Sequence, residues 1–329
     1  MIWFLEGQAS QREIVLAARH ALPADIKVYA SHSSQRPEIT SAADAAFLEP
    51  KNLDQRVDWV LETAAANNIR VILAGKKIAI YEARRAEFEA VGITLVTGVQ
   101  SADQLRLESK AVFTEECIAA GLAVVPGVAV DTLEELTACY KKMKDTGEVC
   151  IKPVNGIYGA GFWRFDDTVD PFYCLAYPDN RQIHFDTYLT IFKESNNSKP
   201  QLMMPYMPGD EVSTDIVVEA GTPIAWVGRR KKGIYQHFEN RGPAVELALA
   251  AVSHFGLDGI VSVQTKEDSG GKPHLLEVNL RYSGGIAYTH LSGVNLPGIF
   301  SCRRLGLPVP DSHWQDDVRV KPVTSAISW

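Results

Sequence analysis

The sequence predicts an α/β protein, and three observations support this fold class. Short apolar runs alternate with helical patterns through the first hundred residues, as in an open parallel sheet with helices between its strands. A glycine-rich segment, residues 155–161, lies between two strand-like runs. Polar side chains recur at alternate positions of a later strand-like run, at residues 277–281. We expect an N-terminal open parallel α/β domain followed by a mixed α+β region.

The N-terminal domain is predicted from apolar spacing. Strands are expected at residues 1–5, 26–30, 44–48, 71–74 and 93–97, and helices at residues 10–21, 52–67 and 79–91. The middle helix has apolar residues at helical spacing from Leu53 to Ala64. The turn after the first strand, Gly7–Ser10, lacks the G-x-G-x-x-G pattern, so a Rossmann dinucleotide site is not expected.

The rest of the chain shows the same kind of signals. Helices are expected at residues 101–120, 131–144, 185–194, 244–255 and 295–305, and strands at residues 149–153, 162–165, 202–206, 213–218, 223–227, 259–265, 274–278 and 318–323. Residues 166–200 are polar and irregular outside their helix, and residues 233–242 are expected to form a glycine-bracketed loop.

The glycine-rich segment has the sequence N-G-I-Y-G-A-G. It is not a Walker loop, because no G-K-[S/T] follows and no helix begins there. We interpret residues 155–161 as a flexible hairpin flap; an ordinary hairpin turn is the alternative.

Composition excludes several classes of protein. A chain of 329 residues suits two or three lobes, and 46% hydrophobic with 22% charged residues is typical of a soluble globular protein. The net charge of −7 argues against a nucleic-acid partner. There is no basic N-terminal stretch, no apolar run of 18 residues and no C-x-x-C among the five cysteines. We expect a cytoplasmic protein with no membrane partner.

The run E-V-N-L-R-Y-S-G-G at residues 277–285 predicts a metal–phosphate site. Glu277, Asn279 and Arg281 share one face of a strand because side chains alternate. Mg²⁺ takes oxygen ligands, often carboxylates together with substrate phosphates, and the arginine fork suits a phosphate. Gln264 on another strand can add a third oxygen. An exposed edge strand with surface polar residues is the alternative.

Further segments suit a nucleotide. Lys110, on a helix, and Lys152, at the end of a strand before the flap, are cations for phosphates. Adenine needs an apolar slot and ribose needs a hydrogen-bond acceptor. The slot candidates are Met204, Tyr206 and Met207, and the ribose candidate is Glu211. The alternatives are solvated lysines and a core edge followed by an exposed turn.

In order and spacing these segments resemble the ATP-grasp superfamily, in particular its carbamoyl-phosphate-synthetase-like branch. The resemblance covers nearly the whole chain. It implies an N-terminal domain at residues 1–105 and a two-lobed ATP-grasp domain at residues 106–329. Within the second domain it implies a lid at about residues 127–203 and a metal-binding core at about residues 204–329.

The resemblance also implies roles for individual residues. Two magnesium ions, for which Mn²⁺ can substitute, would be held by Gln264, Glu277 and Asn279, and Arg281 would grip the transferred phosphate. The nucleotide would be contacted by Lys110, Lys152, the flap glycines Gly156, Gly159 and Gly161, and the segment Met204, Tyr206, Met207 and Glu211. One departure is Met204, followed by Pro205, where many relatives have a hinge glutamate. The usual side-chain contact to the adenine amino group is therefore absent.

These roles imply an ATP- and Mg²⁺-dependent ligase, which would activate a substrate carboxylate as an acyl phosphate and join it to an amine. Arg230, or its neighbour Arg229, is a candidate anchor for the carboxylate or γ-phosphate; a solvated strand end is the alternative. His237 and Arg241 could face the substrate. The partners are a small-molecule carboxylate and amine, whose identities no motif reveals. A homodimer is one arrangement that the resemblance leaves open.

Two alternatives keep the fold and change the activity. One is a catalytically silent nucleotide-binding scaffold, which the retention of Glu277, Asn279 and Arg281 disfavours. The other is a kinase or carboxyphosphate-forming enzyme. The absence of a biotin-domain sequence and of a second synthetase half argues against a complete biotin-carboxylase or carbamoyl-phosphate-synthetase role.

Overall fold

The computed structural model of the chain describes residues 1–7, 10–156, 159–195, 199–323, 326 and 328. The chain folds into two compact units. Unit 1 comprises Met1–Leu105, Asp210–Thr265 and Val278–Trp329, and unit 2 comprises Arg106–Gly209 and Lys266–Glu277. The predicted sequence domains, residues 1–105 and 106–329 with their lid and core, stay a prediction.

The first sheet of unit 1 has five strands in the order β3-β2-β1-β4-β5. These strands are β1 (Ile2–Phe4), β2 (Val28–His32), β3 (Ala45–Leu48), β4 (Val71–Leu73) and β5 (Thr94–Val96). Each neighbouring pair is parallel, which confirms the predicted open parallel domain. From β1 the chain adds strands first on one side and then on the other. The topological switch point therefore lies between β1 and β4.

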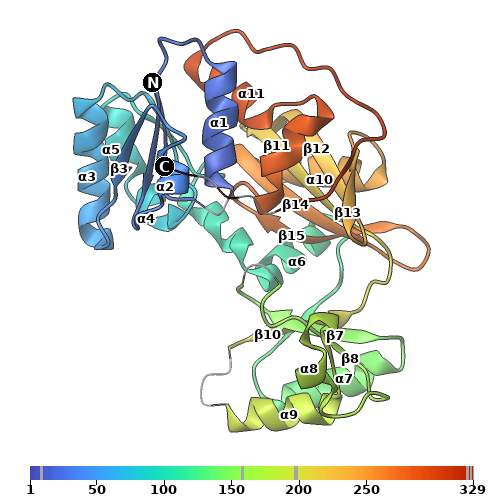
Figure 1. Ribbon diagram of the computed structural model, residues 1–329. Helices are drawn as coiled ribbons and strands as arrows, with labels where there is room; N and C mark the ends of the chain where they lie inside the picture. Colours follow the sequence, from blue (N-terminus) through green and yellow to red (C-terminus); the bar gives the residue numbers. More distant parts are fainter. Residues whose placement is uncertain (8–9, 157–158, 196–198, 324–325, 327, 329) are drawn as a thin grey trace. The chain divides into compact units, whose positions relative to one another are not determined.

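Helices cover both faces of this sheet. Ile2 and Phe4 of β1 belong to a core cluster with Ile14 of helix α1 (Gln11–Ala21). Trp3 points to the opposite face, where its ring lies 5.6 Å from that of Trp59 in helix α3 (Leu53–Ala66). Figure 1 shows α1 and α3 on opposite sides of the strands. Burial on both faces explains why these strands are apolar runs in the sequence.

The helix predicted at residues 79–91 is wrong, because the structure has two shorter helices. These are α4 (Ile78–Glu82) and α5 (Arg85–Ala90). The guanidinium of Arg85 donates hydrogen bonds to the backbone carbonyls of Leu95, at 2.9 Å, and Val99, at 3.1 Å. These tertiary contacts fix the start of α5. The chain therefore turns between α4 and α5, although the sequence pattern is that of one continuous helix.

The second sheet has six strands in the order β15-β14-β11-β12-β13-β16. They are β11 (Glu211–Glu219), β12 (Thr222–Lys232), β13 (Tyr235–Glu239), β14 (Gly259–Glu267), β15 (Pro273–Asn279) and β16 (Arg319–Val320). The expected loop at residues 233–242 is wrong, since β13 occupies half of it. Phe238 is buried, and His237 pairs with Arg230 across an antiparallel ladder with β12. The predicted strand at residues 223–227 therefore continues through the basic residues.

Three further helical segments complete unit 1. They are α10 (Pro243–His254), the 3₁₀ helix η3 (Gly284–Ser292) and α11 (Leu296–Leu305). A short helix, α2 (Pro37–Thr40), lies in the N-terminal part. Asn295 caps α11 and also donates from Nδ2 to the carbonyl of Ala17 at 2.8 Å. This bond ties α11 to α1 across much of the sequence.

Unit 2 is built on a five-stranded sheet in the order β6-β10-β7-β8-β9. Its strands are β6 (Val128–Val130), β7 (Val149–Pro153), β8 (Trp163–Phe165), β9 (Gln182–Ile183) and β10 (Gln201–Pro205). Its helices are α6 (Lys110–Ala119), α7 (Leu133–Lys144), α8 (Tyr173–Ala176) and α9 (Phe185–Glu194), with the 3₁₀ helix η2 (Pro178–Asn180). A further 3₁₀ helix, η1 (Ala102–Glu108), contains the boundary between the two units. Helix α7 begins with a capping box formed by Thr132 and Glu135. Residues 166–200 hold more regular structure than expected, because α8, η2 and β9 lie there.

Among the described residues no helix is both long and apolar enough to cross a membrane.

Candidate functional site

Three of the predicted nucleotide and metal residues converge in unit 2. The Nζ atom of Lys110 lies 3.6 Å from Oε2 of Glu277, and Nζ of Lys152 lies 3.8 Å from the same oxygen. The three side chains come from α6, β7 and β15, far apart in the sequence. One carboxylate oxygen thus lies between two ammonium groups, and we call these three residues the charged triad.

Backbone contacts fix the position of Lys110. Ser109 caps α6 by accepting a hydrogen bond from the amide of Val112. The amide of Lys110 donates to the carbonyl of Val154 at 3.2 Å, and its ammonium donates to the carbonyl of Gly156 at 2.8 Å. The start of α6 is therefore tied to the end of β7 and the beginning of the glycine loop.

The charged triad is largely removed from solvent. Lys110 and Lys152 are each only 8% exposed, and Glu277 is half-buried. Buried charges interact more strongly than exposed ones and are little screened by salt. Two cations beside one carboxylate therefore make a local field that favours an incoming anion.

An apolar cluster in the same unit contains the three predicted slot residues. Met204 is buried, and Tyr206 and Met207 pack against its cluster together with Phe162 and Leu276. The guanidinium of Arg164 lies 5.0 Å from the centre of the Tyr206 ring, a cation–π distance. We call the five apolar residues the apolar slot. Sequence reasoning missed Phe162 and Leu276, although one ends the glycine segment and the other precedes Glu277.

Part of the hinge backbone, at residues 204–206, is already engaged within the protein. Met204 is paired with Cys150 in the antiparallel β10–β7 ladder, so its main chain is part of the sheet. The amide of Tyr206 donates to the carbonyl of Glu148 at 2.8 Å. Burial raises the pKa of the Cys150 thiol to about 12, which makes this cysteine an inert core residue. Of the hinge donors, the Tyr206 amide is thus already bonded within the protein.

The glycine segment joins β7 to β8 as an antiparallel hairpin, as predicted. Gly161 has a φ of +77°, and a Cβ atom there would lie 2.7 Å from Cγ of Pro153. Gly159 has a φ of +64°. These two positions therefore require glycine for conformational reasons. The predicted flap also includes residues 157–158, which lie outside the described residues.

In unit 1, Arg229 is the centre of a buried polar group. Its Nε donates to Asp215 at 2.7 Å, and its Nη atoms donate to Gln236 and Ser283 at 2.9 Å each. Burial by itself would lower the pKa of Arg229, but the neighbouring Asp215 carboxylate leaves the pKa raised. A Cβ at Gly285 would lie 2.1 Å from the guanidinium, so the turn after Ser283 fits closely around it. Arg229 is built into the fold and holds this turn.

Arg230 points to the other side of β12 and has different partners. Its Nε donates to Glu239 at 2.8 Å, and Nη1 donates to Asp210 at 3.2 Å. Glu211, the predicted ribose acceptor, is paired with Lys231. For either residue to bind a ligand as predicted, these pairs must open or be shared. The Lys231 side chain is 48% exposed, so its pair with Glu211 costs little to break. The Arg230–Glu239 pair is mostly buried, with side chains 18% and 16% exposed, and costs more to break.

The remaining predicted residues, Arg281, Gln264 and Asn279, belong to unit 1. Arg281 donates to the carbonyl of Tyr282 at 3.4 Å, and no ion pair within the described residues engages it. Gln264 and Asn279 are half-buried. Their side-chain amides make no hydrogen bond in the part of the chain that the structure describes. All three side chains thus have donors or acceptors available for a ligand.

The donor set suits a hard cation such as Mg²⁺. Glu277 and Asn279 occupy alternate positions of β15 and offer oxygen atoms, and β14, which carries Gln264, neighbours β15 in the sheet. Only one of the three is a carboxylate. Among the described residues there is no group of three or more His, Cys, Asp and Glu side chains placed to hold a metal. The metal set of Gln264, Glu277 and Asn279 therefore stays a prediction.

Comparison with known proteins gives one family match and many structural ones. Residues 197–326 match the family described as ATP-grasp in the biosynthetic pathway with Ter operon. No curated protein matches the chain.

Two solved structures illustrate the likeness. The biotin carboxylase domain of 2-oxoglutarate carboxylase from Hydrogenobacter thermophilus, a dimer in complex with MgADP, ADP and bicarbonate, is 17% identical. The alignment covers 97% of this chain and 73% of that one, with a TM-score of 0.65. The ADP complex of PurK, an N5-carboxyaminoimidazole ribonucleotide synthetase, is also 17% identical. It aligns over 95% of this chain and 78% of that one, with a TM-score of 0.67.

The same enzyme from Thermotoga maritima is 13% identical, aligns over 95% of this chain and 77% of that one, and has a TM-score of 0.65. The three alignments extend over nearly all of this chain, so the likeness concerns the whole fold rather than one lobe. The predicted fold is therefore confirmed, and residues 197–326 match an ATP-grasp family model.

Proposed function

We propose that this protein is an ATP- and Mg²⁺-dependent ligase that activates a substrate carboxylate as an acyl phosphate and joins it to an amine. The observation that carries the proposal is the charged triad in the same unit as the apolar slot. Nucleotide binding requires cations for the phosphates and an apolar space for the base. The ATP-grasp fold and the nucleotide complexes of similar structures support the same activity.

The two lysines of the triad would bind the polyphosphate of ATP. The Nζ atoms of Lys110 and Lys152 lie 3.6 Å and 3.8 Å from Oε2 of Glu277. Both distances exceed that of an ordinary hydrogen bond. An incoming phosphate would gain two charge-assisted hydrogen bonds from these ammonium groups. As the lysines turn to phosphate, the Glu277 carboxylate becomes available to a cation. Ligand binding and metal binding would therefore reinforce each other.

The apolar slot would take the adenine ring. Tyr206 and Met207 are only partly buried, so their side chains can cover a planar base. Met204, in place of a carboxylate, offers the base only an apolar contact. Selection for adenine would then rest on main-chain groups of the hinge.

Arg281 would stabilise the transferred phosphoryl group. Such transfer depends mainly on positioning and charge neutralisation, since it needs little covalent help from the protein. When bound to Gln264, Glu277 and Asn279, Mg²⁺ would neutralise phosphate charge during the transfer. In the first step a carboxylate oxygen of the acid bonds to the γ-phosphorus and ADP leaves with the bridging oxygen. In the second step the amine nitrogen bonds to the acyl carbon, phosphate leaves, and the nitrogen loses a proton.

The glycine flap would protect the intermediate. An acyl phosphate hydrolyses in water, so a lid that closes over the site preserves it for the amine. Gly159 and Gly161, with their positive φ angles, give the hairpin a backbone that other residues adopt poorly.

The direct test is a screen of pooled carboxylic acids and amines for the conversion of ATP to ADP. We expect ADP to form only when an acid and an amine are both present, and mass spectrometry should detect an amide product. ADP formation with an acid alone, with a phosphate ester on a hydroxyl group of that acid as the product, would replace the ligase by a kinase. If no pool yields ADP and no nucleotide binds, the proposal is overturned.

A carboxyphosphate-forming enzyme is the second candidate. The observation in its favour is the similarity to a structure that contains bicarbonate together with MgADP. Bicarbonate therefore belongs among the acids of the screen. ADP formation that depends on bicarbonate, with incorporation of ¹³C-labelled bicarbonate into the product, would select this candidate.

A further inference from the structure

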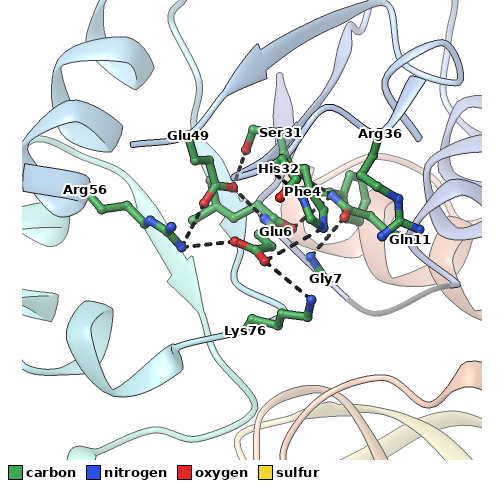
Figure 2. A network of polar contacts seen from close by, with 12 residues as sticks. Phe4, Glu6, Gly7, Gln11, Ser31, His32, Arg36, Glu49, Arg56 and Lys76 are labelled. Atoms are coloured by element: carbon green, nitrogen blue, oxygen red, sulfur yellow. Dashed lines mark hydrogen bonds and ion pairs between the residues drawn. The ribbon is translucent and has the colours of Figure 1, made fainter. Parts of the chain in front are cut away.

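A second polar cluster lies at the carboxyl edge of the N-terminal parallel sheet. Four of its residues follow or end successive strands: Glu6 after β1, His32 at the end of β2, Glu49 after β3 and Lys76 after β4. Arg56 of α3 lies between the two carboxylates (Figure 2). The proposed ATP chemistry uses none of these residues. We call these five residues the edge cluster.

Strong bonds hold the inner half of the edge cluster. Oε1 of Glu49 accepts hydrogen bonds from the amide of Glu6, at 2.6 Å, and from the hydroxyl of Ser31, at 2.7 Å. Arg56 donates to Oε2 of Glu6 at 3.1 Å and lies 3.4 Å from Oε2 of Glu49. Burial raises the pKa of Glu49. This half is a fixed frame that positions the Glu6 carboxylate.

The outer half of the edge cluster, His32 and Lys76, has more hydrogen-bond donors than acceptors. His32 is 5% exposed, and its Nδ1 accepts a hydrogen bond from the amide of Ser34 at 3.0 Å. Burial lowers the pKa of His32, so the neutral ring carries its proton on Nε2. That Nε2 has no hydrogen-bond partner within the described residues, and Oε1 of Glu6 lies 3.8 Å away. Figure 2 shows His32 pointing toward Glu6.

Lys76 adds donors on the solvent side. Its ammonium lies 3.4 Å from Oε1 of Glu6, and about one third of its side chain is exposed. An ammonium group has three N–H donors, and Glu6 accepts from one of them. The imidazole N–H of His32 and the Lys76 ammonium therefore approach the same carboxylate oxygen with bonding capacity to spare.

The position of the edge cluster is itself informative. In open parallel sheets, ligands bind beyond the carboxyl ends of the strands at the topological switch point, which here lies between β1 and β4. Gly7 and Gly75 follow these two strands and approach closely, because a Cβ at Gly75 would lie 2.7 Å from Cα of Gly7. The Tyr282 side chain lies against both glycines, since its hydroxyl would be 1.5 Å from a Cβ at Gly7 and 2.8 Å from a Cβ at Gly75.

We propose that the edge cluster binds an anionic group, a carboxylate or a phosphate, of a small molecule, through the Nε2–H of His32 and the ammonium of Lys76. A buried donor without a partner is costly unless a ligand accepts its hydrogen bond. Glu6 positions both donors and accepts from a hydroxyl or amide of the same ligand. The inference goes beyond the proposed ligase activity, since it assigns a second ligand site that requires no nucleotide.

The test uses the full chain without nucleotide at constant ionic strength. Sodium phosphate, sodium succinate and methylammonium chloride are titrated separately while the imidazole ¹H–¹⁵N signals are recorded. The His32 signal is the one missing from His32→Gln, and calorimetric titration provides a second measurement of binding. We expect a saturable shift of the His32 signal with phosphate, with succinate or with both. The responding anion identifies the group that the site takes.

Matched variants locate the binding site. Lys76→Met should weaken binding of the responding anion by about tenfold, the effect of one charge-assisted hydrogen bond. Lys27→Met is the control, because Lys27 is an exposed lysine that precedes β2 at the opposite edge of the same sheet. No saturable response to either anion, a response to methylammonium alone, or equal losses in the two variants would overturn the proposal. None of these results bears on ATP turnover, so the ligase proposal is tested separately.

Discussion

The charged triad of unit 2 and the edge cluster of unit 1 hold similar residue types in different ways. In the triad, two lysines share one oxygen of Glu277 at distances of 3.6 Å and 3.8 Å. In the edge cluster, Glu49 and Arg56 make bonds of 2.6 Å to 3.1 Å with their neighbours. One group has long contacts and an excess of positive charge, whereas the other is bonded tightly on its inner side. Under the proposed function the triad reorganises around an anion, whereas the inner side of the edge cluster is already bonded within the protein.

This difference predicts that substitutions in the edge cluster mainly lower stability, whereas substitutions in the charged triad mainly lower activity. Removing a partner from a tightly bonded buried group leaves an uncompensated charge and destabilises the fold. The contacts of Glu277 within the triad are longer, at 3.6 Å and 3.8 Å, so its neutralisation should cost less stability. The following experiments test this separation, from the largest expected effect to the smallest.

Arg56→Met should cause the largest loss of stability. The Arg56 side chain is 4% exposed and neutralises both Glu6 and Glu49. Its removal should lower the free energy of unfolding of unit 1 by about 3–5 kcal/mol, measured by urea denaturation. Arg70→Met is the control, since Arg70 is exposed before β4, and should change stability by less than about 0.5 kcal/mol. Equal losses of stability in the two variants would mean that Arg56 does not hold the Glu6 and Glu49 carboxylates in place.

Glu277→Gln should abolish turnover while leaving the fold intact. The change keeps the side-chain size but removes the only carboxylate of the predicted metal set, so the rate of ADP formation should fall by about 100-fold or more. Glu134→Gln, an exposed position in the first turn of α7, should leave the rate unchanged. A Glu277→Gln enzyme with wild-type turnover would rule out the metal assignment.

Arg281→Met should reduce the catalytic rate by about 100-fold, the effect of losing one transition-state contact. Its thermal midpoint should stay at the wild-type value, because no carboxylate among the described residues depends on Arg281. Arg229→Met provides the contrast, since loss of Arg229 strands the buried Asp215 and should unfold the protein at lower temperature. A rate unaffected by Arg281→Met would remove it from the active site.

The pH dependence of stability gives the smallest effect. Burial lowers the pKa of His32 in the folded protein, so the unfolded chain, with a histidine pKa of about 6.5, binds more protons. Stability should therefore rise with pH from the lowered folded pKa up to about 6.5, by at most about 1.4 kcal/mol per pH unit for one proton. His32→Gln should reduce this slope, whereas His20→Gln, at an exposed position in α1, should keep it. An unchanged slope in His32→Gln would contradict the attribution of this pH dependence to the lowered pKa of His32.

Much of the fold could be predicted because it depends on local patterns. Short apolar runs between helical patterns predicted the parallel strands, and apolar residues at helical spacing predicted α3. The helix at residues 79–91 failed because the bonds of Arg85 to Leu95 and Val99 are invisible in a local pattern. The loop at residues 233–242 failed because five residues with one buried aromatic are too short a signal for a strand.

The site was predictable only in part. The motif around Glu277 and the positions of Lys110 and Lys152 led to three residues that the structure brings together. The partners of Arg229 and Glu6 could not be inferred, since they lie up to 70 residues away from each other in the sequence. Pairings of this kind depend on the tertiary fold, and one sequence does not contain them as a pattern.

The central claim is that Lys110, Lys152 and Glu277 bind a magnesium nucleotide. Calorimetric titration of the wild-type protein with a non-hydrolysable ATP analogue, with and without Mg²⁺, tests it most directly, beside Lys152→Met and the exposed control Lys142→Met. We predict Mg²⁺-dependent binding that Lys152→Met weakens by about tenfold or more and Lys142→Met leaves unchanged. Absence of binding by the wild type, or equal affinities in both variants, would contradict the account.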